Sequence, residues 1–239
     1  MFDPRGPTFF ELARQALSST TKGYDLLAEK FEYTPFRTPD EVLIPLAEKV
    51  GPPASIRRAL DLCCGTGAAL WHLRSRCREE VVGIDLSEGM LAVAERRLRE
   101  APGTAEVVLE KGDALDLKYR ERFDVITSVG AFGHILEPQQ EGFCQAVYRA
   151  LVPGGRFLFL TAPMPPFFSR AHLISRGFNG VMHVRNLLIK PPFIMFYLTF
   201  PLERAREVLT EQGFEVEEER PFNEGPFQSL VLVEARRPC

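Results

Sequence analysis

The sequence predicts an α/β protein with a Rossmann-like, doubly wound sheet that is mostly parallel and has helices on both faces. From Ile56 onward, short apolar runs alternate with amphipathic stretches of helical spacing. Strands that alternate with helices form parallel βαβ crossovers. The first apolar run ends in the turn Gly65-Thr66-Gly67, and glycines let a backbone approach a ligand closely. We therefore expect a ligand site beyond the end of the first strand.

The composition is that of an ordinary globular chain. Its 239 residues are 45% hydrophobic and 26% charged, which fits one large domain or one domain with an insertion. The net charge of −3 argues against a general electrostatic grip on nucleic acid. The five cysteines show no Cys-x-x-Cys spacing, so we expect no disulfide framework, no metal site and a cytoplasmic location. Neither a signal peptide nor a membrane-spanning helix is expected.

The first 55 residues are predicted to be a helical segment that closes the cofactor site. Apolar residues at helical spacing in residues 9–31 predict one or two helices, broken near Gly23. After a loop with prolines, another helix is expected, capped by Thr38 or Asp40. The stretch 51–55 is rich in glycine and proline and ends the segment.

Residues 56–239 are predicted to form the core. Strands are expected at residues 58–63, 81–85, 105–110, 123–128, 156–162, 214–219 and 227–235. Helices are expected at residues 67–76, 88–100, 139–151 and 201–212.

An insertion at residues 163–200 interrupts the alternation after the fifth strand. It is apolar and aromatic, contains no acidic residue, and reverses the charge of a chain that is acidic overall. Its basic residues are Arg170, His172, Arg176, His183, Arg185 and Lys190. It is interpreted as an amphipathic cap, as a lid over an apolar substrate pocket, or as a segment that rests on an anionic membrane. We favour the lid, because the insertion leaves the sheet at the edge where the ligand site is expected.

The residues beside the glycine turn indicate the kind of ligand. A Gly-x-Gly turn alone is a weak signal, and Leu70 stands where the dinucleotide fingerprint has a third glycine or alanine. Asp61 comes just before the turn. A carboxylate there repels a pyrophosphate but suits an ammonium group, which favours a zwitterionic sulfonium cofactor. A nicotinamide-dependent reductase stays open as an alternative.

The next strand ends also carry suitable groups. Asp85 ends the second apolar run and can accept two hydrogen bonds from ribose hydroxyls. Leu86 follows, in position to lie against an adenine face. After the third strand, Asp113 can accept a hydrogen bond from the adenine amine, and the amide of Ala114 can donate one to a ring nitrogen.

Five stretches, in this order, resemble the class I S-adenosylmethionine-dependent methyltransferases: DLCCGTG, GIDLSEGML, GDALDL, FDVITSVGAFGHI and LVPGGRF. The chain is most similar to the small-molecule group that includes the ubiquinone and menaquinone C-methyltransferases, over about residues 56–162. The resemblance implies seven strands with the last one antiparallel, and S-adenosylmethionine as the cofactor with S-adenosylhomocysteine as its product. It implies that the methionine end of the cofactor lies against Asp61, Gly65, Thr66 and Gly67, bordered by Ser128 and Val129. Cys63 and Cys64 depart from the usual small residues there, without an expected loss of binding.

His134 is the candidate catalytic residue. It follows the fourth strand, where the reactive methyl group should point, and an imidazole can remove a proton near neutral pH. The alternative is that it packs or caps the following loop. Tyr24 and Tyr33 are candidates to close over the cofactor, although aromatic residues at helical spacing also serve as core.

The predicted reaction is methyl transfer by in-line displacement to a small, hydrophobic or aromatic acceptor. Orientation of the reactants can supply much of the acceleration. The alternatives are a cofactor-binding protein of the same fold without activity, or a methyltransferase that acts on nucleic acid or protein. An Asn-Pro-Pro-Tyr-type motif after the fourth strand, an appended RNA-binding domain and a double-glutamate hairpin are all missing from the sequence.

Overall fold

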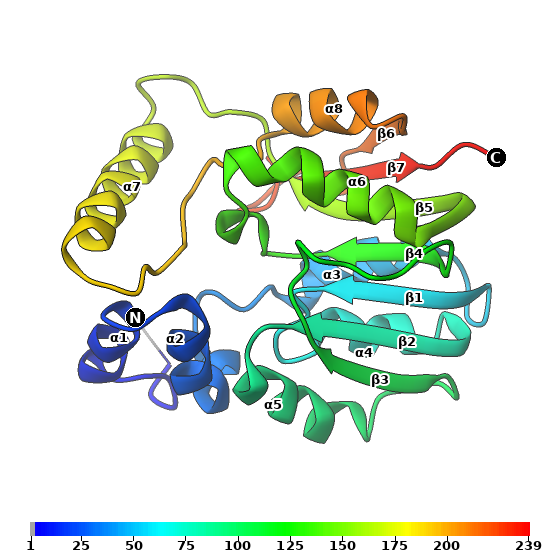
Figure 1. Ribbon diagram of the computed structural model, residues 1–239, viewed down its shortest axis with the longest axis horizontal. Coiled ribbons are helices and arrows are strands. Elements are labelled where there is room, and N and C mark those ends of the chain that lie inside the picture. Colours follow the sequence, from blue (N-terminus) through cyan, green and yellow to red (C-terminus); the bar gives the residue numbers. More distant parts are fainter. Residues whose placement is uncertain (1–2) are drawn as a thin grey trace.

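A single seven-stranded sheet forms the centre of the computed structural model, which describes residues 3–239 (Figure 1). The strand order is β3-β2-β1-β4-β5-β7-β6. The strands are β1 (Ile56–Leu62), β2 (Cys77–Asp85), β3 (Glu106–Lys111), β4 (Phe123–Ser128), β5 (Leu151–Thr161), β6 (Glu215–Glu219) and β7 (Val231–Arg236). The first five strands pair in parallel, and β7 runs antiparallel to both β5 and β6. The predicted fold class is confirmed, including the antiparallel last strand.

Helices cover both faces of the sheet. On one face, α3 (Asp40–Val50), α4 (Ala68–Arg74) and α5 (Glu88–Leu98) share an apolar cluster with alternate residues of β1, β2 and β4. On the other face, α6 (Gln140–Ala150) and α8 (Leu202–Glu211) bury a larger cluster that is rich in phenylalanine. Successive strand residues point to opposite faces, so the near-continuous apolar runs fill both clusters.

Residues 3–39 form α1 (Phe9–Ala16), α2 (Thr20–Leu27) and the 3-10 helix η1 (Ala28–Tyr33), which lie beyond the carboxyl ends of the parallel strands (Figure 1). The expected break near Gly23 is wrong: the chain breaks before α2, whose N-cap is Ser19. Gly23 is needed for packing instead, because a Cβ there would lie 2.6 Å from the ring of Phe193.

The expected caps of α3 are also wrong. Pro39 takes the N-cap position without a side-chain hydrogen bond. Asp40 is the first helical residue, and its carboxylate accepts hydrogen bonds from Arg37 and His72. Because α3 packs against α4 and β5, it belongs to the layer on the sheet, and the predicted division of the chain at residue 55 stays a proposal.

The insertion at residues 163–200 contains a 19-residue helix, α7 (Arg170–Leu188), followed by an extended loop. It stands apart from the sheet, on the same side of the molecule as α1 and α2 (Figure 1). Two asparagines on α7 hold the loop. The side chain of Asn179 bonds to the backbone N–H and carbonyl of Tyr197, and that of Asn186 to the same groups of Phe193, all at 2.8–3.0 Å.

Candidate functional site

The strand order reverses between β1 and β4, and we refer to the carboxyl ends of these two strands as the crevice. The chain continues from β1 to β2 and β3 on one side of the sheet, and to β4 and β5 on the other. Ligands of open α/β sheets bind at such a reversal of strand order. The register aligns Asp61 of β1 with Gly83 of β2 and with Thr127 of β4.

Asp61 is a buried carboxylate without a cationic partner among residues 3–239. It accepts a hydrogen bond of 2.6 Å from the hydroxyl group of Thr127. Burial, with a smaller contribution from the charge of Asp85, raises the pKa of Asp61 to about 7. A cationic group of a ligand would restore the ionised form.

The two glycines of the turn have different roles. Both have positive φ, 53° for Gly65 and 79° for Gly67, a region that favours glycine. A Cβ on Gly67 would lie 3.1 Å from Leu98 and 3.2 Å from Ala94, so Gly67 allows α5 to pack closely. A Cβ on Gly65 would meet nothing within 4 Å. The open space of this turn therefore lies over Gly65.

Asp85, at the end of β2, is bonded to the backbone of the same turn. One carboxylate oxygen accepts from the amide of Gly65 and the other from the amide of Ser87, both at 2.9 Å. Burial raises the pKa of Asp85 above its usual value, although the two amides oppose this. The neighbouring Leu86 is 44% exposed, so its apolar side chain is accessible to a ligand.

The other predicted contacts lie at the ends of β3 and β4. The exposed Asp113 accepts a hydrogen bond of 2.9 Å from the amide of Leu115, and Ala114 is buried. Ser128 is also buried, and its hydroxyl group donates to the carbonyl of Leu62. Because that hydroxyl is bonded within the sheet, Ser128 can contact a ligand only through its backbone.

Two adjacent cysteines complete the turn. Cys63 has φ of 56°, which is uncommon for a residue other than glycine. Burial raises the pKa of both thiols, Cys63 and Cys64, well above the usual value. Thiols in this state are poor nucleophiles and metal ligands. Among residues 3–239, no cluster of three histidine, cysteine or acidic residues could hold a metal ion.

The N-terminal segment contacts the crevice through carboxylates that sequence reasoning missed. Asp25 of α2 accepts hydrogen bonds from the hydroxyl of Ser87 at 2.6 Å and from the amide of Gly89 at 3.0 Å. Glu32 accepts one of 2.5 Å from the hydroxyl of Thr66 and also pairs with two arginines. The contacts to Ser87, Gly89 and Thr66 join residues 34 or more positions apart, so no local pattern indicates them.

Tyr24 and His134 meet at the end of β4. The Tyr24 oxygen lies 2.9 Å from His134 Nε2, and His134 Nδ1 lies 2.5 Å from the carbonyl oxygen of Ile194 in the insertion. A carbonyl can only accept, so the proton is on Nδ1, and Tyr24 donates to Nε2. Burial lowers the pKa of His134 and raises that of Tyr24. The imidazole is therefore neutral at neutral pH.

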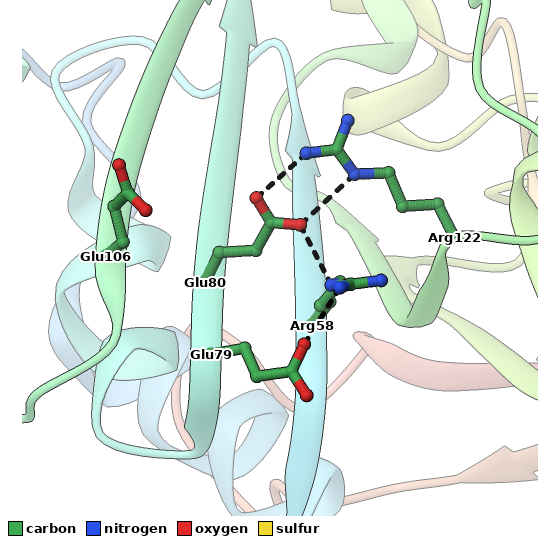
Figure 2. Close-up of a pocket in the computed structure, with 5 residues that line it drawn as sticks. All are labelled: Arg58, Glu79, Glu80, Glu106 and Arg122. Carbon is green, nitrogen blue, oxygen red and sulfur yellow. Dashed lines mark hydrogen bonds and ion pairs between the residues drawn. The ribbon is translucent and has the colours of Figure 1, made fainter.

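A hollow of about 330 Å³ lies at the opposite, amino ends of the strands (Figure 2). Arg122 bonds to both carboxylate oxygens of Glu80, at 3.1 and 2.8 Å, and Arg58 bonds to Glu79 at 2.9 Å. Four of the five charged residues that line the hollow thus form an ion-pair network, and Glu106 is the fifth.

The carboxyl edge, in contrast, carries two carboxylates that no cation of the described residues neutralises. Asp61 is bonded to the hydroxyl of Thr127, Asp85 is bonded only to amides, and a Cβ on Gly65 would meet nothing within 4 Å. This edge and the strand order, with an antiparallel β7 between β5 and β6, define the class: a Rossmann-like α/β domain of the methyltransferase type.

Comparison with known proteins gives the same class. A family described as a methyltransferase domain matches residues 59–155. A demethylmenaquinone methyltransferase from Symbiobacterium thermophilum is 37% identical over 114 residues, which are 46% of this chain and 44% of that protein. The demethylmenaquinone methyltransferase of Geobacillus kaustophilus is 30% identical over 181 residues, 71% of this chain and 75% of that protein. The chain spans a little under half the length of several curated relatives that it matches.

A solved structure shows the shared fold. Magnesium protoporphyrin IX methyltransferase from Synechocystis PCC 6803, with bound S-adenosylhomocysteine, has a TM-score of 0.56 and 18% identity, covering 83% of this chain and 80% of its own. The protein belongs to the class I S-adenosylmethionine-dependent methyltransferases.

Proposed function

We propose that the protein transfers a methyl group from S-adenosylmethionine to a small apolar acceptor, a quinol-type ring of the kind for which its relatives are named. Bound S-adenosylmethionine would supply a methyl group on a sulfonium centre. The chain's own residues then have three tasks: to bind, to orient and to remove a proton. A cytoplasmic location is part of the proposal, because all five cysteines are free thiols.

One observation carries the proposal. Asp61 and Asp85 are carboxylates at adjacent strand ends that lack cationic partners among the described residues, and Asp85 bonds to the amide of Gly65, where a Cβ would meet nothing within 4 Å. An ammonium group at Asp61 and two ribose hydroxyls at Asp85 would satisfy both. The exposed Leu86 and the loop of Asp113 and Ala114 would then lie beside the base.

His134 would act as the general base. Its Nδ1–H is held by the carbonyl of Ile194, which leaves the lone pair of Nε2 for a proton. An acceptor hydroxyl that replaces Tyr24 at Nε2 would lose its proton there. The adjacent ring carbon, made nucleophilic, would form the new C–C bond as the C–S bond breaks, and would then lose its own hydrogen as a proton.

The insertion would supply the apolar side of the acceptor site. Met182, Phe193 and Phe196 form a small cluster that also includes Tyr24, the partner of His134. This cluster keeps water from the imidazole and suits an aromatic ring better than a charged substrate. The role of the insertion as a lid rests on this contact.

The test is methyl transfer from radiolabelled S-adenosylmethionine to a reduced, prenylated naphthoquinone lacking the ring methyl. The wild-type protein should label this acceptor, and His134→Ala should lower kcat by about 100-fold or more. His134→Ala should still bind S-adenosylhomocysteine, because the hydrogen bonds of the His134 ring go to Tyr24 and Ile194 and not to Asp61 or Gly65. Binding without turnover on any of a panel of quinols, phenols and amines would support the non-catalytic alternative.

Tyr24→Phe separates a base from a packed histidine. The Tyr24 hydroxyl stabilises neutral imidazole in the free enzyme, so its loss should raise the pKa of His134 and move the acidic limb of the kcat/KM profile to higher pH. A merely structural His134 predicts lower stability in this variant with an unmoved pH profile.

A further inference from the structure

The outer face of α7 is unpartnered and strongly apolar. Six aliphatic side chains on it are each more than half exposed: Leu173, Ile174, Val181, Val184, Leu187 and Leu188. Their spacing of three, four and seven residues puts them on one arc of the helix. Singly exposed apolar residues are ordinary on a protein surface, but a continuous arc of six marks an interaction surface.

The inner face of α7 fixes the orientation of this arc. Asn179 and Asn186 bond to the loop that follows, and Met182 is buried against Phe193 and Phe196. The helix thus has one satisfied side, which faces Tyr24 and the crevice, and one side that faces outward.

Arg185 ties α7 to the N-terminal segment. Its guanidinium donates to the carbonyls of Ala16 at 2.8 Å and Ser18 at 2.6 Å, at the end of α1. Exposed aromatic pairs begin both segments: Phe9 and Phe10 at α1, and Phe167 and Phe168 just before α7. Both elements lie on the same side of the molecule (Figure 1).

The charges around the arc indicate what kind of partner binds to it. The insertion carries four of the 29 lysines and arginines and none of the 32 acidic residues. Arg170, Arg176 and Lys190 are exposed, and none of them takes part in an ion pair among the described residues. A second copy of this chain on the same face would bring like charges together without an acid to pair them. Aliphatic, aromatic and basic residues together match an anionic lipid surface.

We infer that α7, with the phenylalanine pairs that begin α1 and α7, docks on the surface of an anionic lipid bilayer. The helix would lie in the interface, with its six exposed aliphatic side chains toward the acyl chains and its cations at the headgroups. No helix among residues 3–239 combines the length and apolar character needed to cross a bilayer, so the contact is peripheral.

The test is sedimentation of the full chain with vesicles of phosphatidylcholine, alone or with about 30% phosphatidylglycerol. The protein should bind the anionic vesicles at least about fivefold more tightly, and raising the salt to about 0.5 M should weaken that binding. Val181→Glu combined with Leu188→Glu should weaken it at least about tenfold. Ile44→Glu, an exposed apolar position on α3, is the matched control and should bind as the wild type does.

The cations are tested by Arg170→Gln with Arg176→Gln, which should lower binding to anionic vesicles toward the level on neutral ones. Absence of vesicle binding, or equal binding to both compositions, overturns the inference. So does a concentration-dependent dimer in solution that Val181→Glu with Leu188→Glu abolishes, because a second copy then covers the face. Titration with S-adenosylhomocysteine should be the same in all these variants, which separates this inference from the proposed methyl transfer.

Discussion

At the amino ends of the parallel strands, Glu79 and Glu80 are each bonded to an arginine, whereas at the carboxyl ends Asp61 and Asp85 are bonded to a hydroxyl group and to backbone amides. The first pair of carboxylates is matched by cations. In the second pair Asp61 is buried and Asp85 is partly buried, and burial raises the pKa of both. Burial of a carboxylate without a cation is unfavourable. The carboxylates at the carboxyl edge can therefore still bind polar groups of a ligand, whereas those at the amino edge are already bonded to arginines.

The largest expected difference concerns Asp85 and Glu79. Asp85→Asn should weaken S-adenosylhomocysteine binding by about 30-fold or more, because each hydrogen bond to a charged acceptor contributes roughly 1.5–3 kcal/mol. Isothermal titration calorimetry measures this. Glu79→Gln, the matched change at the amino edge, should leave the affinity as it is. Equal affinities in the two variants would remove the distinction between the two ends of the sheet.

The two glycines sharpen the definition of the carboxyl edge. Gly67→Ala should lower the free energy of unfolding by about 2 kcal/mol, because it combines an unfavourable positive φ with crowding against Leu98 and Ala94. Gly65→Ala should cost about 1 kcal/mol from φ alone, but should weaken S-adenosylhomocysteine binding. Urea unfolding and calorimetry separate the two effects. A Gly65→Ala protein with unchanged affinity would exclude the space over Gly65 from the ligand site.

The pH dependence of binding tests Asp61. Its pKa is about 7 in the folded protein, so it is largely protonated at about pH 6 and ionised at about pH 8. If it holds the ligand's ammonium group, S-adenosylhomocysteine affinity should rise by about tenfold across this range. Asp61→Asn should bind weakly and lack most of this rise. Parallel pH profiles for wild type and variant would place the ammonium group elsewhere.

The same residue sets a trend in stability. An unfolded aspartate titrates near pH ~3.9, so between about pH 4 and about pH 7 the folded protein holds a proton that the unfolded chain has lost. Stability of the unliganded protein should therefore fall as pH rises through this window. Asp61→Asn should remove this component, measured as the difference between the urea unfolding curves of the two proteins.

The smallest expected effect is at the amino edge. Glu80→Gln breaks the paired contact with Arg122 and the contact with Arg58, and should lower the free energy of unfolding by about 1 kcal/mol. Ligand affinity should not change. A loss of affinity in this variant would mean that the two ends of the sheet are coupled.

The core of the fold could be predicted because its signal is local. Alternating strands and helices, and the aspartates at or near the ends of the first three strands, are read within short windows of sequence. The helix α7 was missed, because Gly177 and Gly180 and the flanking prolines obscure its period, and because its contacts to Tyr197 and Phe193 arise only in the folded chain. The helix break predicted at Gly23 was wrong for the same reason. A glycine stands there because Phe193, far along the sequence, packs against it.

The candidate site could be predicted at the strand ends but not where the N-terminal segment meets them. Asp61 and Asp85 lie at the ends of β1 and β2 and His134 follows β4, so topology alone gathers them at one edge. Asp25 and Glu32 lie on α2 and η1, and the spacing of residues in the sequence does not predict where these helices pack against the sheet. The tautomer of His134 likewise depends on Ile194, which lies 60 residues further along the chain.

Tyr24 and Asp25 are consecutive residues of α2, yet they contact different loops. Tyr24 reaches the loop after β4 through His134, and Asp25 reaches the loop after β2 through Ser87 and Gly89. One eight-residue helix therefore contacts the loops on both sides of the crevice. If α2 moved away from the sheet edge, its hydrogen bonds to both loops would break together, so we expect this short helix to open both sides of the cofactor site in one step.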